Sequence, residues 1–261
     1  MTAATSPTLP ELARLAEEAG LNASAPPQQS RIDGWLLRLS PGKAKRSRCV
    51  NALAEGSLPL PELLARCQQA FAAAGPPLLL RITPYSQPAD LDARLAALGW
   101  SKLDEALVMV RASLDGLPPP LLPDDTRLLP VDAATYAQGV GALRGSSETE
   151  IAAHAERLAA SATRYQGFWL HREAPGGSGL LSCGQIALEG DLVGLYDIAT
   201  PAALQGQGHA GRLCLALLQQ ARQQGARHAY LQVDPSNAPA MALYRRLGFV
   251  EAYRYHFRQA P

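Results

Sequence analysis

The sequence predicts an α/β protein built from two similar modules in tandem. Helical and strand-like hydrophobic patterns alternate through most of the 261 residues, and the order helix–strand–helix–strand occurs once in each half. In both halves the two helices end at glycines with nearly the same spacing, Gly75 and Gly99 in the first and Gly225 and Gly248 in the second. We therefore expect duplication of one module, with chance similarity of amphipathic segments as the alternative.

The first half contains one isolated strand and one copy of the repeated pattern. Alternating apolar residues predict a strand over 35–39. The repeated pattern then predicts helices over 63–74 and 90–98 and strands over 78–82 and 100–110.

The second half is richer in signals. Ser147 and Glu150 form a capping box at the start of a predicted helix, and Glu189-Gly190-Asp191 predicts a tight hairpin. The predicted helices are 148–160, 209–224 and 238–247, and the predicted strands are 168–171, 180–188, 192–199, 228–233 and 249–257, with a turn at 174–179.

A proline-rich segment divides the two halves. Prolines at 118–120 and 123 disfavour both a helix and a central strand. We therefore predict a module over residues 1–116, a linker over 117–125 and a second module over 126–261.

Composition and charge exclude several classes of protein. The formal net charge is +1, from 24 basic and 23 acidic residues, which predicts neither a nucleic-acid partner nor an anionic membrane partner. No apolar run approaches the roughly 20 residues of a membrane span, and the start lacks a secretion signal. The four cysteines are widely spaced and the histidines show no metal spacing, so we expect reduced thiols, no metal and a cytoplasmic location.

The glycine-rich segment 205–211 lies between a predicted strand and a predicted helix. Its small residues allow several backbone N–H groups to converge on a phosphate, at the positive end of the helix dipole. A flexible turn is the alternative. Gly206, Gly208 and Gly211 also match the dinucleotide fingerprint with Asp234 as its acidic residue, but 200–205 separates the loop from its strand and little chain follows Asp234. No Lys-Ser or Lys-Thr pair supports a triphosphate loop.

Four features in order resemble the GNAT superfamily of N-acetyltransferases. Gln205-x-x-Gly208-x-Ala210 resembles the [Q/R]-x-x-G-x-[G/A] loop, and 195–201 resembles the preceding strand. Asn237 and Leu243-Tyr244-x-x-Leu247-Gly248-Phe249 match later family features. The resemblance covers roughly 126–258 and implies two GNAT-like mixed-sheet modules with the acetyl-CoA site in the second.

The resemblance also implies the roles of individual residues. Acetyl-CoA would be the co-substrate, and the acceptor would be a small-molecule or peptide amine. Tyr244 would protonate the leaving thiolate, and Asp197 is the first candidate for the general base. The cofactor-binding residues implied are Ile198, Ala199, Thr200, Gln205, Gly206, Gln207, Gly208, His209, Ala210, Gly211 and Asn237.

A general base or a deprotonating water chain is required because an alkylamine of pKa near 10.4 is mostly protonated at neutral pH, and its deprotonation costs about 4 to 5 kcal/mol. Glu148 and Glu150 are the second candidates for this base. An ideal strand would place Asp197 with Leu195 and Ala199 on one face, whereas a β-bulge would invert that assignment.

The first module resembles a degenerate GNAT copy. Leu58-Pro59-Leu60-Pro61 stands in the place of the phosphate loop, and proline lacks the N–H group that binds phosphate. This module is therefore expected to be a structural partner or a wall of the substrate cleft. A basic cluster, Lys43, Lys45, Arg46 and Arg48, is expected to be a solvated face, with an acidic substrate or nucleic acid left open. The other functions left open are a non-catalytic acyl-CoA-binding or regulatory protein and, third, a dinucleotide oxidoreductase.

Overall fold

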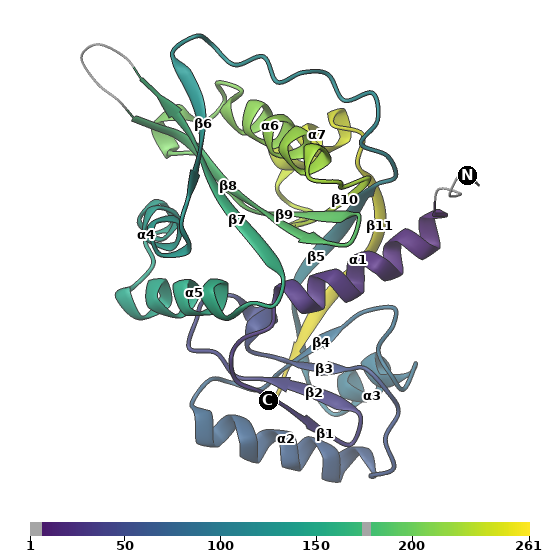
Figure 1. Ribbon diagram of the computed structural model, residues 1–261. Helices are drawn as coiled ribbons and strands as arrows, with labels where there is room; N and C mark the ends of the chain where they lie inside the picture. The colour runs from purple at the N-terminus through teal and green to yellow at the C-terminus, as the bar shows by residue number, and fades with distance from the viewer. Residues whose placement is uncertain (1–6, 174–178) are drawn as a thin grey trace.

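A computed structural model describes residues 7–173 and 179–261, which fold around one 11-stranded mixed sheet (Figure 1). The predicted turn at 174–179 lies, except for Gly179, outside the described residues. In spatial order the strands are β1 (Gln29–Ile32), β2 (Trp35–Arg38), β3 (Val50–Ala52), β4 (Leu79–Ile82), β11 (Val250–Gln259), β5 (Ser101–Arg111), β10 (His228–Val233), β9 (Leu192–Ala199), β8 (Gly179–Glu189), β7 (Arg164–Arg172) and β6 (Thr126–Val131).

The two halves of the chain exchange their last strands at the centre of this sheet. In each half a parallel pair, β3–β4 or β9–β10, is followed by an antiparallel strand from the other half. Thus β11 lies between β4 and β5, and β5 lies between β11 and β10. This common pattern supports the tandem arrangement. The proposed division at 117–125 remains a prediction, because the hydrogen-bonded sheet continues across it.

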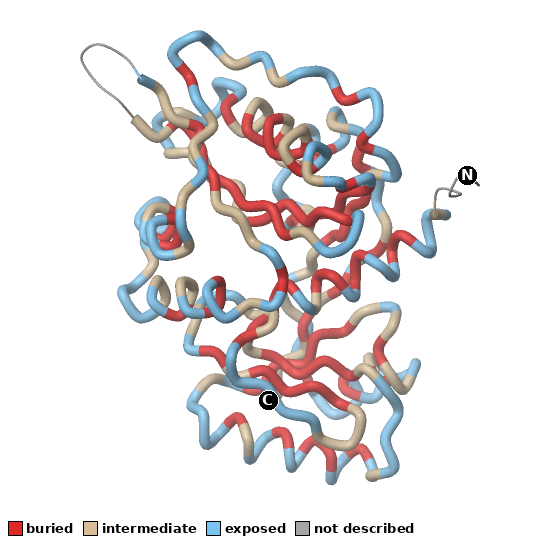
Figure 2. Tube along the Cα trace, in the orientation of Figure 1, coloured by how far each residue is buried: buried red, intermediate tan, exposed pale blue. Residues whose placement is uncertain are grey.

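Helices cover both faces of the sheet (Figures 1 and 2). Helices α6 (His209–Gln223) and α7 (Ala238–Arg246) pack on one face of the second half, and α1 (Leu9–Ala23) packs on the opposite face across its centre. Helix α5 (Glu148–Ala160) reaches the C-terminal end of α1, and α4 (Ala133–Arg144) packs against α5 on the side away from α1, while α2 (Leu60–Ala74) and α3 (Leu91–Ala97) cover the first half. Short 3₁₀ turns occur at Lys45–Ser47 and Ala202–Leu204.

The predicted helices and strands are found, mostly within a few residues of their expected ends. Ser147 and Glu150 form the capping box of α5, and Gly190 turns the β8–β9 hairpin with φ of 59°. Helix α1 was not predicted, although its buried residues Leu12, Ala16 and Ala23 follow helical spacing. None of the described helices is long and apolar enough to cross a membrane. The four cysteines are buried and unpaired.

The proline-rich linker packs against the second module. Leu117 is buried in the core beneath α6, and Gln219 Nε2 donates to the carbonyls of Leu117 and Pro118, both at 2.9 Å. Pro118, Pro119 and Leu121 also line the large groove described below. The linker is therefore one wall of that groove.

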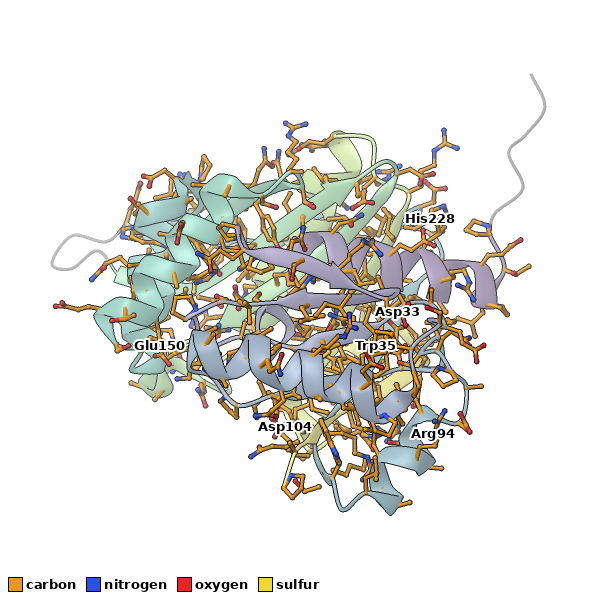
Figure 3. All side chains as sticks on the ribbon, turned by 90° about the horizontal axis from the view of Figure 1, so that it is seen from below. Asp33, Trp35, Arg94, Asp104, Glu150 and His228 are labelled. Atoms are coloured by element: carbon orange, nitrogen blue, oxygen red, sulfur yellow. The ribbon has the colours of Figure 1, made fainter. Side chains whose placement is uncertain are left out.

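In the first module a carboxylate binds the backbone where a phosphate loop would lie. Asp33, in the β1–β2 turn, accepts from Ser57 N at 3.0 Å and from Leu58 N at 2.7 Å, beside the start of α2 (Figure 3). A Cβ on Gly56 would collide with the same carboxylate. These amides are already occupied, which agrees with a degenerate copy.

Candidate functional site

The site begins where two parallel strands separate. β9 and β10 are paired only over Leu192–Leu195 and His228–Leu231, so the remaining residues of β9 diverge from β10. A groove of about 1100 Å³ lies at this opening, between the end of β9, the loop before α6 and the start of α7. The separation leaves an extended main chain along one wall of the groove.

A β-bulge shapes that wall. Asp197 has φ of 52°, and the β8–β9 register gains one residue between Tyr196 and Ala199. The bulge changes the facing of the side chains: Leu195 and Ile198 both pack in the core beneath α6, whereas Asp197 faces α4 and α5. The ideal alternation, with Asp197 and Leu195 on one face, is therefore wrong here, and the inverted assignment is the observed one.

The glycine-rich loop presents free backbone donors to the groove. Gly206 and Gly208 have φ of 76° and 81°, a region that costs other residues strain. The first amide bond of α6 runs from Arg212 N to Gly208 O at 3.1 Å, so the N–H groups of residues 209–211 have no partner within the helix. Arg212 Nη1 donates to Gln207 O at 3.1 Å, which adds positive charge beside the loop. This arrangement suits a phosphate.

Most of the predicted cofactor-binding residues lie together on this groove. Those that line it are Ile198, Thr200, Gln205, Gly206, Gly208, His209, Ala210, Gly211 and Asn237. Ala199 and Gln207 are not among its lining residues: Ala199 packs toward α4, and the Gln207 amide donates to Ala203 O at 3.3 Å. Only the main chain of these two residues remains a candidate for cofactor contact.

His209 begins α6, inside the loop. Its side chain is buried, and neither ring nitrogen has a hydrogen-bond partner in the described part of the chain. Burial, together with the charges of Arg212 and Arg172, lowers the pKa of His209, so the imidazole is neutral at pH 7. Any role toward a phosphate would therefore be that of a neutral hydrogen-bond donor.

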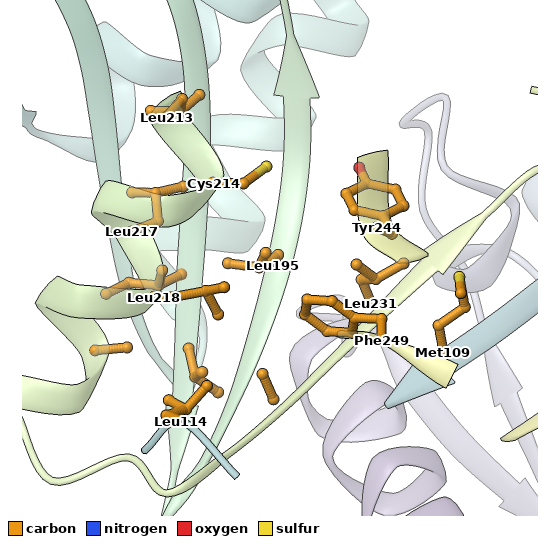
Figure 4. Packing of buried hydrophobic residues seen from close by; sticks show 14 of the residues in the cluster. Met109, Leu114, Leu195, Leu213, Cys214, Leu217, Leu218, Leu231, Tyr244 and Phe249 are labelled. Atoms are coloured by element: carbon orange, nitrogen blue, oxygen red, sulfur yellow. The ribbon is translucent and has the colours of Figure 1, made fainter. Parts of the chain in front are cut away.

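Asn237 and Tyr244 flank the groove from α7. Asn237 Oδ1 accepts from Ala240 N at 3.2 Å and so caps the helix, which leaves its amide NH₂ for other partners. The Tyr244 ring packs edge-on against Phe249, with ring centroids 6.1 Å apart, and its hydroxyl points away from the labelled apolar side chains (Figure 4). Burial raises the pKa of Tyr244, so this hydroxyl keeps its proton at neutral pH.

A second, smaller cavity of about 160 Å³ adjoins the groove. It is bounded by α4, α5 and the 40–47 segment of the first module. Arg46, Arg144, Tyr196 and Asp197 line both spaces, so the bulge of β9 stands at their junction. A compound in the smaller cavity would thus meet the larger groove at Asp197.

The carboxylate of Asp197 is held by two basic side chains. Arg144 Nη1 donates to Oδ1 at 2.6 Å, and His154 Nε2 lies 3.3 Å from Oδ2. Burial alone would raise the pKa of Asp197, but His154 and the Arg144 charge hold it well below the usual range. A carboxylate so stabilised is a poor proton acceptor, which weakens its candidacy as the general base.

His154 is the site residue that sequence reasoning missed. It lies on α5 one turn after Glu150, and both line the smaller cavity, whereas Glu148 lines neither space. Glu150 Oε2 accepts from Ser147 N at 3.0 Å, so its carboxylate caps the helix. The i, i+4 spacing of Glu150 and His154 was the available signal, but nothing local indicated Asp197 as a partner. Tyr136, also not singled out, donates to Asp197 O at 3.0 Å and fixes the bulge.

Comparisons with known proteins agree with this geometry. Residues 145–249 match the sequence model of the acetyltransferase (GNAT) family. A relative from Bacillus subtilis (strain 168), named uncharacterized N-acetyltransferase YobR, is 24% identical over 238 residues, 88% of this chain and 91% of the relative. A GCN5-related N-acetyltransferase from Kribbella flavida has a similar structure, with a TM-score of 0.66, 18% identity and 95% of both chains covered. A tandem GNAT protein from the clavulanic acid biosynthesis pathway, solved without AcCoA, has the same TM-score and identity, covering 92% of this chain and 88% of its own.

Proposed function

We propose that this chain, whose residues 145–249 match the model of the acetyltransferase (GNAT) family, transfers an acetyl group from acetyl-CoA to a primary amine of a small molecule or peptide. The observation that best supports this is the opening between β9 and β10, which leads to the free amides of the loop before α6. An extended acyl carrier with a diphosphate fits both parts of the groove.

The proposed binding mode places the diphosphate at the N–H groups of residues 206–211. The pantetheine arm would follow the unpaired main chain of Ile198, Ala199 and Thr200, with the Asn237 amide beside it. Backbone N–H groups near Ile198 would then stabilise the oxyanion that develops on the thioester carbonyl.

In the proposed reaction the amine attacks the thioester carbon directly, and formation of the C–N bond gives a tetrahedral oxyanion. The C–S bond breaks when the carbonyl re-forms, and CoA leaves as the thiolate. We assign the proton acceptor to His154 in place of Asp197. His154 Nε2 lies 3.3 Å from Asp197 Oδ2 but makes no hydrogen bond to any residue that the structure describes. A small rotation of the imidazole would let Asp197 accept from Nε2–H, which would leave the lone pair of Nδ1 for the amine proton. Imidazole is the side chain most often used as a general base. Tyr244 would donate a hydrogen bond to the departing thiolate.

Two measurements test the proposal. Calorimetry with CoA and acetyl-CoA checks the groove, and release of free thiol from acetyl-CoA with a panel of amines checks the reaction. Thiol release that depends on an amine is the expected result. Tight binding with no release for any amine would instead favour a non-catalytic acyl-CoA-binding protein, and no heat on a folded sample would reject the groove assignment.

A further inference from the structure

The smaller cavity carries more cationic than anionic groups. Its charged lining residues are Lys43, Arg46, Arg144, Arg157, Glu150 and Asp197. Both carboxylates are already engaged, Asp197 by Arg144 at 2.6 Å and Glu150 by the backbone of α5. The charges of Arg46, Arg157 and Lys43 are therefore not balanced within the cavity.

Arg46 has an unused donor at the junction of the two spaces. Its Nη1 atom is buried and has no hydrogen-bond partner among residues 7–173 and 179–261. The guanidinium lies over the ring of Tyr196, 5.6 Å from the centroid. Neighbouring contacts fix this segment, because Ser47 Oγ donates to Ser24 O at 2.9 Å and Lys45 pairs with Asp104. A guanidinium whose free donor is buried favours an anion beside it.

Arg157 approaches the cavity from α5. It is buried, and its Nη1 atom meets only neutral oxygens, Ala23 O at 2.9 Å and Tyr165 Oη at 3.4 Å. Its guanidinium lies 5.4 Å from the Tyr165 ring, which packs edge-on against Tyr196. Through this tyrosine pair the two arginines share one wall of the cavity, and no carboxylate of the described chain forms an ion pair with either.

We infer that the acceptor of the second module is an anionic amine, whose carboxylate or phosphate is bound by Arg46 and Arg157 with Lys43 at the cavity mouth. This inference rests on the proposed acetyl transfer. The first module then has a defined part in the site, since it supplies Arg46 and Lys43. The sequence-based expectation that the basic cluster is only a solvated face does not hold for Arg46.

The same charges assist the chemistry. A protonated amine next to several guanidinium groups is disfavoured, so its pKa falls and a larger fraction is the neutral nucleophile. The attraction of the anionic group for Arg46 and Arg157 offsets the repulsion that the amine meets. A polycationic acceptor has no such compensation and is expected to bind poorly.

The kinetic test compares acceptors that differ in charge. β-Alanine supplies a carboxylate, O-phosphoethanolamine a phosphate, and ethanolamine and spermidine supply no anion. We expect kcat/KM for one or both anionic amines to exceed that for ethanolamine at least about tenfold. The better of the two substrates shows whether the site prefers a carboxylate or a phosphate. Arg157→Gln should remove most of this preference while CoA affinity stays unchanged, and Arg157→Lys should restore part of it. Arg164→Gln, an exposed change on β7, controls for net charge.

A binding test judges the inference without turnover. Inorganic phosphate and acetate are titrated by NMR into the wild type and Arg157→Gln, with CoA present at saturation. Weaker anion binding in the variant supports the inference. Equal binding in both proteins, or faster acetylation of ethanolamine or spermidine, overturns it. Arg157 lines the smaller cavity and not the groove. A protein that binds no CoA would therefore contradict the proposed function without deciding whether an anion binds at Arg157. If Arg46→Gln weakens CoA rather than anion binding, Arg46 is removed from the acceptor site.

Discussion

His154 and Asp197 face each other at the junction of two cavities, with Nε2 of the imidazole 3.3 Å from Oδ2 of the carboxylate. The residues come from α5 and from the bulge of β9, and Arg144 occupies the other carboxylate oxygen. Asp197 stays ionised around neutral pH because His154 and the Arg144 charge hold its pKa well below the usual range, so a charged carboxylate faces the imidazole.

The pair predicts a separation of roles. His154→Gln should lower kcat by about 10²- to 10⁴-fold, the usual contribution of a general base, with little change in CoA affinity. Asp197→Asn should lower kcat less and leave Arg144 without its partner. Steady-state kinetics over pH 5.5–9 measures both, with His171→Gln as a control on β7. An unchanged rate and pH profile in His154→Gln would remove His154 from the reaction.

Tyr244→Phe should slow thiol release by about 10- to 100-fold, because a hydrogen bond to a charged group contributes about 1.5–3 kcal/mol. Burial raises the pKa of Tyr244, so its loss should be felt equally at pH 7 and pH 9, where the hydroxyl is still protonated. CoA affinity, measured by calorimetry, should be retained. Tyr85→Phe, a half-buried tyrosine outside the groove, is the matched control. Equal rates for wild type and Tyr244→Phe would contradict the assignment.

Gly208→Ala should weaken CoA binding at least about tenfold. Space is not the cause, since only the Arg212 guanidinium lies within 4 Å of the added Cβ. The φ of 81° costs a non-glycine residue about 1–2 kcal/mol, and relief of that strain turns the amides away from the phosphate. Gly190→Ala carries similar strain at φ of 59° in the distant hairpin. Gly190→Ala should lower the melting temperature about as much as Gly208→Ala but leave the affinity for CoA unchanged. Loss of affinity in both variants would show that destabilisation of the fold, and not the loop itself, weakens CoA binding.

Glu17→Gln should destabilise the fold by about 3–5 kcal/mol, because it leaves a buried arginine without its carboxylate. Glu17 accepts from Arg81 at 2.6 and 2.8 Å and from Tyr253 at 2.5 Å, joining α1, β4 and β11. Burial would raise the pKa of Glu17, but Arg81 and Tyr253 lower it below the ordinary 4.5.

The sign of the pH effect follows from that depressed pKa. The stabilisation is complete above about pH 4.5 and is lost as pH falls further through the folded-state pKa. Urea unfolding at pH 7 and pH 4 should therefore show the gap between wild type and Glu17→Gln narrowing in acid. Exposed Glu18→Gln on the same helix should match wild type at both pH values. A constant gap would mean that the carboxylate charge is not what stabilises the fold.

Local sequence signals predicted much of the second module because each depends on a few neighbouring residues. The Ser147–Glu150 capping box, the Gly190 hairpin and the Gly206–Gly208 loop are all of this kind. Helix α1 carries signals of the same kind, namely a Thr8–Glu11 capping box, Pro10 in its first turn and buried residues at helical spacing, so it was predictable from the sequence although it was not predicted. The structure adds only what this face packs against, Tyr230 among other distant residues.

The amino-acid order alone was enough to predict an α/β tandem with a glycine-rich loop before a helix, since turn chemistry and hydrophobic periodicity are short-range properties. Tertiary structure alone decided three features: the exchange of β5 and β11, the meeting of His154 with Asp197, and the entry of Arg46 and Arg157 into one cavity. Each joins segments far apart in the chain, and the bulge at Asp197 reversed the facing that an ideal strand implies. Such contacts depend on the packing of whole layers, which no local pattern encodes.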